Sequence, residues 1–466
     1  MSDRFRIGIV SGKLGDVDGV SLEVAKWIDI IGERLGHKLL TIAGSYKGPV
    51  HGIDPESQLT LPEIRFDSER QRRFEHHVFP HMHPVAPHIP PGSIKAILDE
   101  MQQEGASVAT EIDRFVQDHE IDVLVGQNTN AMPMTILGGI AMHRVATISR
   151  VATIFHHHDF WWERSRFSNN HIETLLNKIM PPVDIGLEHV VIASYAAHIL
   201  SSLKRVRPFV IPNCEDFDNA VGIDEYNGDF RAEMGFREDD VLFVQPTRIV
   251  PRKRIEDSVE LVGRFQQRFH EYRGRVHYII SLYQGDEPDQ DYIGRIKKRA
   301  AELDVPIHLI SDRVSATRGT NTEGKKTYTN RDVLANADIV TYLPVWEGFG
   351  NALLEAMAAR VPIAVTTYLV YKTDIMPTGF KNIEIRDHYD TNGRLIIPDD
   401  ALETIAHLLT HPEDRRSMVD HNFSLASRDF GFSHLEGRLE ELLREYGDEI
   451  RASRKRRAKR SAHYSV

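Results

Sequence analysis

The chain has 466 residues, and at roughly 150 residues per domain the first expectation is two large domains. Hydrophobic residues at 41% and charged residues at 27% exclude a disordered chain, and a formal net charge of −11 argues against a nucleic-acid binder. The single cysteine, Cys214, excludes an internal disulfide and a cysteine-based zinc site, which fits a reducing compartment.

The N-terminal residues, MSDRFRIGIVSG, lead almost directly into a strand-like run. They lack the long apolar core and the small-residue cleavage site of a secretory signal. No window approaches the run of about 18 apolar residues that a membrane span needs. We therefore expect a cytoplasmic protein.

In the first half of the chain, short apolar runs alternate with longer amphipathic segments. Residues 20–37 carry apolar positions at three- and four-residue spacing, which predicts a helix. The apolar runs predict buried strands at residues 6–12, 38–44, 121–128, 151–158, 189–194 and 208–213. This alternation is typical of βαβ units and a parallel sheet covered on both faces.

Residues 215–240 are acidic and contain glycine, and we interpret them as the crossover between domains. A second series of strands is then expected at residues 241–248, 276–285, 307–311, 338–345, 362–366 and 395–398. The predicted domains are an N-terminal one at 1–215, a C-terminal one at 216–430, and a C-terminal helix with a basic tail at 431–466. If two such domains face each other across a cleft, the carboxyl ends of their strands, where ligands bind, point towards it.

The run VWEGFGNALLEA, residues 345–356, places Glu347 and Glu355 on either side of a Gly-Phe-Gly turn between a predicted strand and a predicted helix. Glycines let the backbone approach a ligand closely, and the free amides at a helix start favour an anion such as phosphate. The alternative is an ordinary helix start with an acidic first turn, which the helix dipole also favours.

The run QPTRIVPRKRIEDS, residues 245–258, lies just beyond a strand of the same predicted domain. Arg248 and Lys253 there are suited to hold a diphosphate, arginine by its fork and lysine as a point charge. For Arg252 and Arg254 we prefer a structural interpretation, a solvated basic turn that caps a helix or pairs with Glu256. A third segment, GKLGDVDGVSLEVAKW at 12–27, is a Gly/Asp-rich loop entering a helix and is suited to cradle a phosphate, although it is not G-x-G-x-x-G.

Together these segments resemble the retaining glycosyltransferases of family 4. The run EGFGNALLEA, followed by YLVYKTDIMPTGF at 368–380, resembles the subgroup that includes sucrose-phosphate synthase and mannosylglucosyl-phosphoglycerate synthase. The residues that carry the resemblance are Asp18-Gly19-Val20, His158-Asp159, Ile211-Pro212-Asn213, Arg248 with Lys253, and Glu347 with Glu355. The resemblance spans nearly the whole chain. It implies an α/β protein with the GT-B fold, which consists of two Rossmann-like, doubly wound parallel-sheet domains facing a cleft.

The resemblance also implies roles for individual residues. Glu347 would bond hexose hydroxyls and Glu355 the ribose of a nucleotide-sugar donor, while Arg248 and Lys253 would take the diphosphate. His158 would lie near the reacting carbon, with His156 as the alternative in the same run. The implied catalytic residues are His158, Glu347, Arg248 and Lys253, and the further donor-binding positions are Gly19, Val20, Gly348, Phe349, Gly350, Asn351 and Glu355.

We expect no metal and no other cofactor. A nucleoside diphosphate is already a tolerable leaving group, so fixed cations and helix amides suffice to stabilise the charge that develops on it. Two metal alternatives exist in the sequence, the D-x-D at Asp216 and Asp218, and the histidines at 76, 77, 81, 83 and 88. We interpret the first as part of the crossover and the second as a polar surface loop.

The segment FHHHDFWWERSRF, residues 155–167, adds aromatic and basic residues after a strand of the N-terminal domain, and the resemblance implies that this domain receives the acceptor. Arg164 and Arg166 would recognise a phosphate or carboxylate, and Trp161 or Trp162 would lie against a sugar face. Asn128 and Asn130 would line the same pocket. The alternative is that the tryptophans pack in the core and the arginines pair with Glu163 or face solvent.

The resemblance favours transfer of a hexose from GDP-mannose or UDP-glucose to a small polar acceptor, such as a phosphorylated sugar or glycerate. A lipid or polysaccharide acceptor at a membrane surface is the alternative, and the basic residues 451–460 would then give weak membrane contact. The simpler explanation of these residues is a solvated, partly disordered end beyond a last helix at 435–447. The resemblance implies that this last helix returns to the N-terminal domain. A nucleotide-sugar epimerase and a non-catalytic sugar-nucleotide sensor remain rival functions, and a homo-oligomer remains open.

Overall fold

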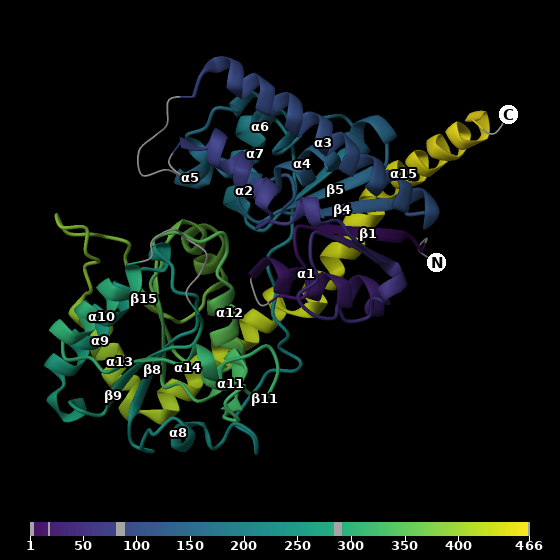
Figure 1. The fold of residues 1–466 in the computed structure, drawn as a ribbon. Helices are drawn as coiled ribbons and strands as arrows, with labels where there is room; N and C mark the ends of the chain where they lie inside the picture. Colours follow the sequence, from purple (N-terminus) through teal and green to yellow (C-terminus); the bar gives the residue numbers. More distant parts are fainter. Residues whose placement is uncertain (1–3, 17–18, 81–88, 284–290, 465–466) are drawn as a thin grey trace. The chain divides into compact units, whose positions relative to one another are not determined.

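The computed structural model describes residues 4–16, 19–80, 89–283 and 291–464, and the chain folds into two compact units (Figure 1). Unit 1 comprises Met1–Pro212 together with Leu435–Val466, and unit 2 comprises Asn213–His434. The boundaries expected after residues 215 and 430 fall a few residues from these. Each unit is built around one parallel sheet, with a short antiparallel pair of strands added in unit 2.

The sheet of unit 1 has the strand order β3-β2-β1-β4-β5-β6-β7, and every neighbouring pair is parallel. Its strands are β1 (Arg6–Ser11), β2 (Lys38–Ala43), β3 (Gln58–Thr60), β4 (Val123–Gln127), β5 (Ala152–His157), β6 (Leu187–Val191) and β7 (Phe209–Val210). Its helices include α1 (Gly19–Asp29), α2 (Glu69–Val78), α3 (Pro91–Asp118), α4 (Ile136–Arg144), α5 (Ser165–Ser168), α6 (Glu173–Ile179) and α7 (Ser194–Lys204). The central strands β4 and β5 are buried along their whole length, as expected for a parallel sheet covered on both faces.

The sheet of unit 2 has the order β10-β9-β8-β13-β14-β15 and is also entirely parallel. Its strands are β8 (Val241–Gln245), β9 (Val276–Ile280), β10 (Ile307–Leu309), β13 (Ile339–Tyr342), β14 (Ile363–Thr366) and β15 (Ile383–Ile385), and the separate pair is β11 (Gly319–Thr320) with β12 (Lys326–Thr327). The helices are α8 (Phe230–Glu233), α9 (Ile255–Arg268), α10 (Tyr292–Glu302), α11 (Asn330–Ala335), α12 (Asn351–Ala358), α13 (Asp399–Thr410) and α14 (Pro412–Phe430). Its core joins apolar residues of β8, β9, α9 and α13, among them Phe243, Tyr278, Phe265 and Ile405.

Two expected elements differ from the structure. The apolar run at 395–398 is not a strand, because Leu395 makes only a single bridge to Tyr389, and the last strand of the sheet is Ile383–Ile385 instead. Both runs are three or four residues long, and periodicity alone does not distinguish a short edge strand from a buried loop. The loop expected at 74–92 begins as the end of α2, and its histidines 81, 83 and 88 lie outside the described residues.

The basic C-terminal segment is helical, so the expectation of a partly disordered end is wrong for this stretch. Helix α15 (Phe432–Tyr464, yellow in Figure 1) continues through residues 451–459 and packs on unit 1. The Tyr446 hydroxyl donates to the Gly186 carbonyl at 2.6 Å, the Ser453 hydroxyl to Arg150 at 2.7 Å, and Arg457 to Ile121 at 2.7 Å. These bonds hold one face of the helix against the rest of unit 1. The C-terminal helix therefore returns to the N-terminal domain, as expected. Among the described residues, no helix is long and apolar enough to cross a bilayer.

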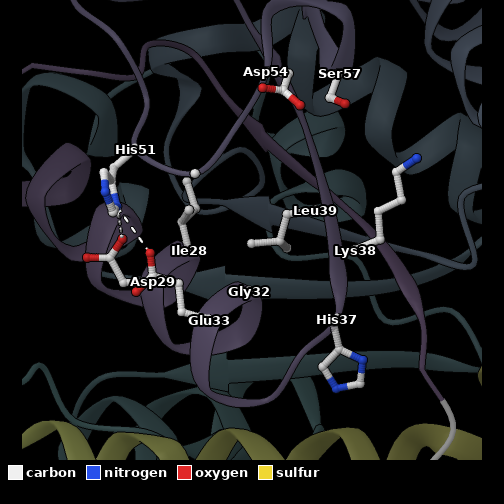
Figure 2. Close-up of a pocket in the computed structure, with 11 residues that line it drawn as sticks. Ile28, Asp29, Gly32, Glu33, His37, Lys38, Leu39, His51, Asp54 and Ser57 are labelled. Carbon is white, nitrogen blue, oxygen red and sulfur yellow. Dashed lines mark hydrogen bonds and ion pairs between the residues drawn. The ribbon is translucent and has the colours of Figure 1, made fainter.

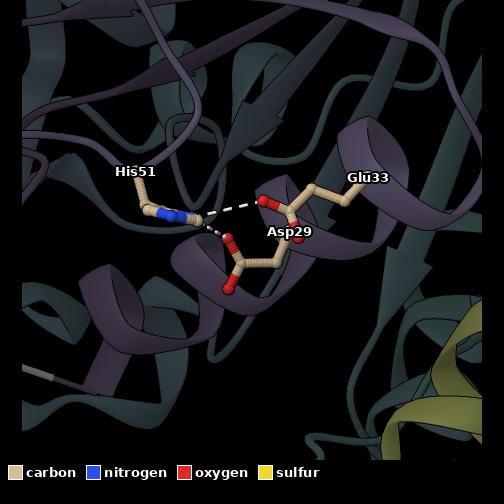
Figure 3. A group of neighbouring side chains, drawn as sticks. All are labelled: Asp29, Glu33 and His51. Carbon is tan, nitrogen blue, oxygen red and sulfur yellow. Dashed lines mark hydrogen bonds and ion pairs between the residues drawn. The ribbon is translucent and has the colours of Figure 1, made fainter.

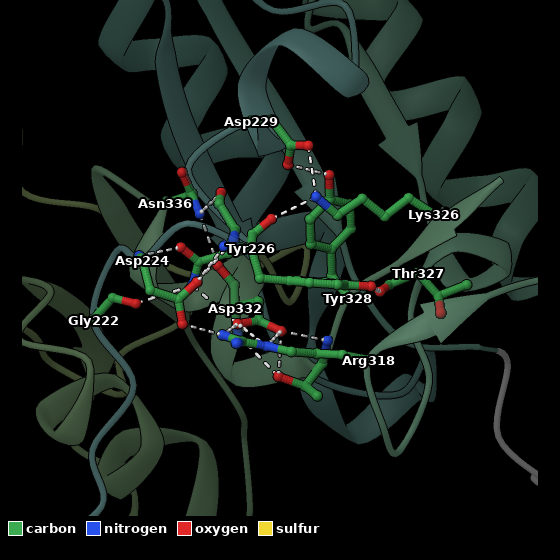
Figure 4. Close-up of polar contacts among 12 residues, drawn as sticks. Gly222, Asp224, Tyr226, Asp229, Arg318, Lys326, Thr327, Tyr328, Asp332 and Asn336 are labelled. Carbon is green, nitrogen blue, oxygen red and sulfur yellow. Dashed lines mark hydrogen bonds and ion pairs between the residues drawn. The ribbon is translucent and has the colours of Figure 1, made fainter.

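A polar network in unit 2 ties the β11–β12 hairpin and the loop around Asp224 to the start of α11 (Figure 4). Its centre is the carboxylate of Asp332, which is fully buried and accepts bonds from Arg318, Asn227 and Thr329 at 2.8–3.2 Å. Arg318 also donates to Asp224 at 2.7 Å. Because α11 begins at Asn330, this network fixes the position of a residue that contacts Glu355.

We predict that Asp332→Asn weakens unit 2, because the amide cannot accept all of the bonds that the buried carboxylate accepts. Hydrogen bonds to charged groups contribute about 1.5–3 kcal/mol each, so the free energy of unfolding should fall by about 2 kcal/mol or more. Urea denaturation would measure the change. Glu323→Gln, which removes only a surface ion pair with Lys325, is the control and should change stability by less than about 0.5 kcal/mol. Equal effects of the two substitutions would contradict a central role for Asp332.

Candidate active site

The candidate site of unit 2 lies where the strand order of its sheet reverses, between β8 and β13. Successive strands run outwards from β8 on one side and from β13 on the other, which opens a crevice at their carboxyl ends. The loop after β8 contains residues 246–254, and the loop after β13 contains residues 343–350. The amide of Val345 donates to the carbonyl of Arg252 at 3.1 Å, so the two loops are joined directly.

Glu347 forms ion pairs with two cations of the facing loop. Its Oε1 lies 2.7 Å from Nη1 of Arg252 and also contacts Nζ of Lys253. Lys253 stands over the ring of Tyr342 at 5.1 Å, and Arg252 over that of Trp346 at 6.0 Å. Only 9% of the Glu347 side chain and 12% of the Lys253 side chain are exposed, so water screens these charges weakly.

The charges in this cluster determine one another's protonation. Burial alone would raise the pKa of Glu347, but Arg252 and Lys253 outweigh it and hold the pKa at about 2. Burial lowers the pKa of Lys253 to about 8, with Glu347 opposing the shift and Arg252 and Arg248 adding to it. Glu347 is therefore a carboxylate at neutral pH. Its contribution to stability is present above the ordinary pKa of a glutamate and is lost as the pH falls towards 2.

The backbone of the Gly-Phe-Gly turn requires a glycine at position 350. Gly350 has φ +142°, and a Cβ on it would lie 2.3 Å from the Tyr368 hydroxyl, which itself donates to the Phe349 carbonyl at 2.5 Å. The Phe349 side chain is buried against Phe430. Helix α12 follows at Asn351, so its first amides lie beside Glu347 in sequence and are suited to an anion.

Asn351 and Glu355 are both held by asparagines. The Asn351 side-chain oxygen accepts from Asn213 at 2.7 Å, and a Glu355 carboxylate oxygen accepts from Asn330 at 2.9 Å. Asn330 in turn accepts from Ser281, which directly follows β9. Glu355 is partly exposed, so a carboxylate of fixed orientation is left accessible for hydroxyl donors.

The structure therefore brings together the residues predicted in the second half of the chain. Arg248 and Gly348 are partly buried in the same two loops as Lys253 and Glu347. Arg252 was missed, because a run of three basic residues gives no indication of which one points inward. Its interpretation as a solvated residue is wrong, whereas Arg254 does pair with Glu256, at 3.6 Å, and more closely with Asp257, at 2.7 Å, at the start of α9. The site combines a carboxylate, cations and helix amides, a set that can bind hydroxyls and phosphates together.

In unit 1, the run of three histidines is divided by the end of β5. His156 and His157 belong to the strand and are about 1% exposed, whereas His158 follows it and is partly exposed. His156 stacks on Trp27 with ring centroids 4.3 Å apart, and its Nδ1 is 2.8 Å from Oε1 of Gln127. Burial lowers the pKa of His156 well below its ordinary value. The amide of His158 donates to Asn128, which follows β4.

The residues predicted to bind an acceptor occupy different environments in the structure. Trp161 is 6% exposed and donates from its indole to Met180 at 2.9 Å, and Asn130 donates to two carbonyls, Gly139 and Ile179. Arg164 donates from Nε to Asp159 at 2.9 Å. Trp161 thus packs in the core, as the alternative interpretation expects, whereas Arg164 pairs with Asp159 rather than with Glu163. Asn128 is buried beside Asp159, and Arg166 lies over the ring of Phe167 at 4.3 Å and is partly exposed.

The Gly/Asp-rich loop of unit 1 follows β1, which pairs with β4 where the strand order of that sheet reverses. Gly19 and Val20 open helix α1 with Gly19 exposed, while Asp18 lies outside the described residues. In the crossover, Asp216 of the D-x-D accepts from the backbone and side chain of Asn219, which is a turn contact. His76 and His77 end α2.

Comparison with known proteins agrees with this geometry. Residues 227–422, most of unit 2, match the family model described as Glycosyl transferases group 1. The mannosylglucosylglycerate synthase of Thermotoga maritima is 29% identical over 446 residues, which cover 92% of this chain and 98% of that protein. The chain is a glycosyltransferase with the GT-B fold.

Solved structures show the same fold for this glycosyltransferase. The sucrose-phosphate synthase of Thermosynechococcus elongatus superposes with a TM-score of 0.62 at 12% identity, covering 95% of this chain and 99% of that one. HepE of Anabaena, solved in complex with UDP-glucose, gives a TM-score of 0.59 at 14% identity, covering 95% of this chain and 100% of that one.

We predict that Glu347→Gln lowers the pKa of Lys253 below about 8, because the carboxylate that opposes the effect of burial is removed. NMR titration of isotope-labelled lysine, with the Lys253 signal assigned from a Lys253→Arg variant, would measure it. Glu384→Gln, whose carboxylate bonds with Tyr371, is the control and should leave the titration unchanged. An unchanged or raised pKa in Glu347→Gln would contradict the coupling of these two groups.

Proposed function

We propose that the glycosyltransferase moves a hexose, with retention of the anomeric configuration, from a nucleotide-diphosphate sugar to a small polar acceptor that carries a glycerate group. The observation that carries this proposal is the Glu347 carboxylate held between Arg252 and Lys253 at the order reversal of the sheet. A single ligand that has hydroxyls next to a diphosphate would match both the carboxylate, which accepts hydrogen bonds from hydroxyls, and the cations, which attract phosphate.

We propose partners in unit 2 for the hexose, the ribose and the diphosphate of the donor. Glu347 accepts from hexose hydroxyls, and Glu355, oriented by Asn330, accepts from the ribose. Arg248, Lys253 and the first amides of α12 take the diphosphate. HepE has been solved with UDP-glucose, which supports this class of donor for the fold.

The relative named mannosylglucosylglycerate synthase supports the choice of sugar and acceptor. Its product name contains mannose, glucose and glycerate in sequence, so a mannosyl donor and glucosylglycerate are the simplest substrates. We propose GDP-mannose as the donor, with UDP-glucose as the alternative that the same assay tests. Among the predicted acceptor residues, Arg166, which is partly exposed, is our candidate for the glycerate carboxylate.

The chemistry we propose breaks the bond between the hexose anomeric carbon and the diphosphate oxygen and forms a bond from that carbon to an acceptor hydroxyl oxygen. The hydroxyl proton leaves with the nucleoside diphosphate. Arg248, Lys253 and the helix amides stabilise the negative charge that develops on the leaving group, in a site where the charges are poorly screened. His158 would lie at the hexose. We propose that no metal is required, because these groups supply the positive charge.

We expect the purified protein to form mannosylglucosylglycerate from GDP-mannose and glucosylglycerate, detected by mass spectrometry, with the configuration at the new linkage assigned by NMR. Glu347→Ala and Lys253→Met should each lower kcat by about 10²–10³, the usual cost of removing one such contact. The exposed Glu323→Gln is the matched control and should retain wild-type turnover. Full activity in Glu347→Ala, or no transfer from any nucleotide sugar, would overturn the proposal.

Turnover should also persist after extensive chelation, since the proposed charge stabilisation comes from side chains and amides. We expect kcat in EDTA to stay within about twofold of the value with added Mg²⁺. Both values are measured well below the melting temperature found in EDTA. A tenfold loss of kcat would correspond to an increase of about 1.4 kcal/mol in the activation free energy. A larger loss that Mg²⁺ restores would show that a metal ion takes part in donor turnover.

A further inference from the structure

A group of three side chains in unit 1, away from the strand ends, has the composition of a metal site. Asp29 ends α1, Glu33 lies four residues later in the short helix Ile30–Arg34, and His51 lies in the loop after β2 (Figure 3). Figure 3 shows both carboxylates turned towards one edge of the imidazole ring. Spacing of four residues puts the two carboxylates on the same face of the helix.

The distances within this group match those between ligands of one small cation. Nδ1 of His51 is 3.2 Å from Oδ1 of Asp29 and 3.6 Å from Oε1 of Glu33. All three ligand atoms lie within 4.8 Å of one another. In a tetrahedral zinc site with bonds of about 2.0–2.2 Å, the ligand atoms stand roughly 3.4 Å apart, so a small cation can lie between these three atoms after little movement.

The group also borders a cavity, which leaves room for a further ligand. The cavity has a volume of about 290 Å³ and is lined by all three side chains together with Ile28, Leu39 and Asp54 (Figure 2). Asp54 adds another carboxylate to the lining. A site with three protein ligands and one open position is the arrangement that zinc adopts when water or a small molecule completes its coordination.

The loop that carries His51 is bonded to the segment that precedes α1. Leu14 donates to Ser45 at 3.0 Å and Lys47 donates to Leu14 at 2.9 Å. Gly15 and Gly48 approach so closely that a Cβ on Gly15 would lie 2.7 Å from the Gly48 carbonyl oxygen. A cation bound by Asp29, Glu33 and His51 would join this loop to the helix at a second point, and thereby restrain the Gly/Asp-rich segment between them.

We propose that Asp29, Glu33 and His51 form a binding site for one Zn²⁺ or a similar late first-row divalent cation, which stabilises unit 1 by joining the loop after β2 to helix α1. Imidazole with carboxylates suits Zn²⁺, Co²⁺ and Ni²⁺, whereas Mg²⁺ and Ca²⁺ prefer oxygen ligands alone. The proposal is independent of the transfer reaction. The competing explanation is a protonated His51 that forms ion pairs with the two carboxylates.

The test is metal binding to the full chain after removal of any affinity tag and of bound metal. Zn²⁺ affinity is measured by competition with a chromogenic chelator, and Co²⁺ serves as a spectroscopic probe of coordination. We expect one equivalent of Zn²⁺ to bind and to raise the melting temperature by a few degrees, with no such effect from Mg²⁺. His51→Gln and Asp29→Asn should weaken this equivalent by at least about 100-fold, because replacement of even an outer-shell partner commonly costs 10–100-fold.

His171→Gln is the matched control, since His171 is exposed in the same unit and, among the described residues, does not belong to the metal-ligand group. It should bind Zn²⁺ like the wild type. Circular dichroism of each variant would show that the exposed substitutions leave the fold intact. The proposal would be overturned if the wild-type chain did not bind Zn²⁺ stoichiometrically. It would also be overturned if the His51→Gln and Asp29→Asn variants bound Zn²⁺ with wild-type affinity and stoichiometry, a result that would assign the binding to other residues.

Discussion

The candidate active site depends on the reversal of strand order between β8 and β13. Sequential βα units run outwards from these two strands, so their carboxyl ends border a crevice. The loops after them therefore meet, although about a hundred residues of chain separate Lys253 from Glu347. A backbone bond from Val345 to Arg252 and the ion pairs of Glu347 join the two loops. The position of the charged cluster is a property of the sheet topology, and the chemistry is a property of the side chains that the loops carry.

The charge balance of this cluster favours an anionic ligand. Burying a carboxylate is costly unless cations compensate it, and Glu347 is compensated by both Arg252 and Lys253. Together with Arg248 the group has a net positive charge at neutral pH. Burial lowers the pKa of Lys253 to about 8, so this lysine is still mostly charged at pH 7, although burial destabilises its charged form. A diphosphate would stabilise that form further, and binding would be coupled to proton uptake by Lys253.

Much of this arrangement could be predicted from the sequence. The βα rhythm predicted both parallel sheets, and the positions of Arg248, Lys253 and Glu347 after predicted strands of one domain predicted that they lie in loops at one end of the same sheet. What could not be predicted has physical reasons. The orientation of Arg252 depends on the turn at residues 251–253. Helix α15 extends to Tyr464, and one of its faces is held by buried contacts such as that of Ser453. In the sequence, the basic residues around Ser453 make the same stretch look like an exposed tail.

The residues predicted to bind the donor and those predicted to bind an acceptor differ in how readily a structural role explains them. A lysine and a glutamate buried together, as Lys253 and Glu347 are, have few structural explanations, since a larger apolar core would be cheaper than an ion pair. Trp161 and Asn130 have common structural explanations, because an indole often fills a core and an amide often donates to buried carbonyls. The three histidines show the same contrast within one segment. The end of β5 leaves His156 and His157 inside the sheet and His158 beyond it, a distinction that depends on one residue of register.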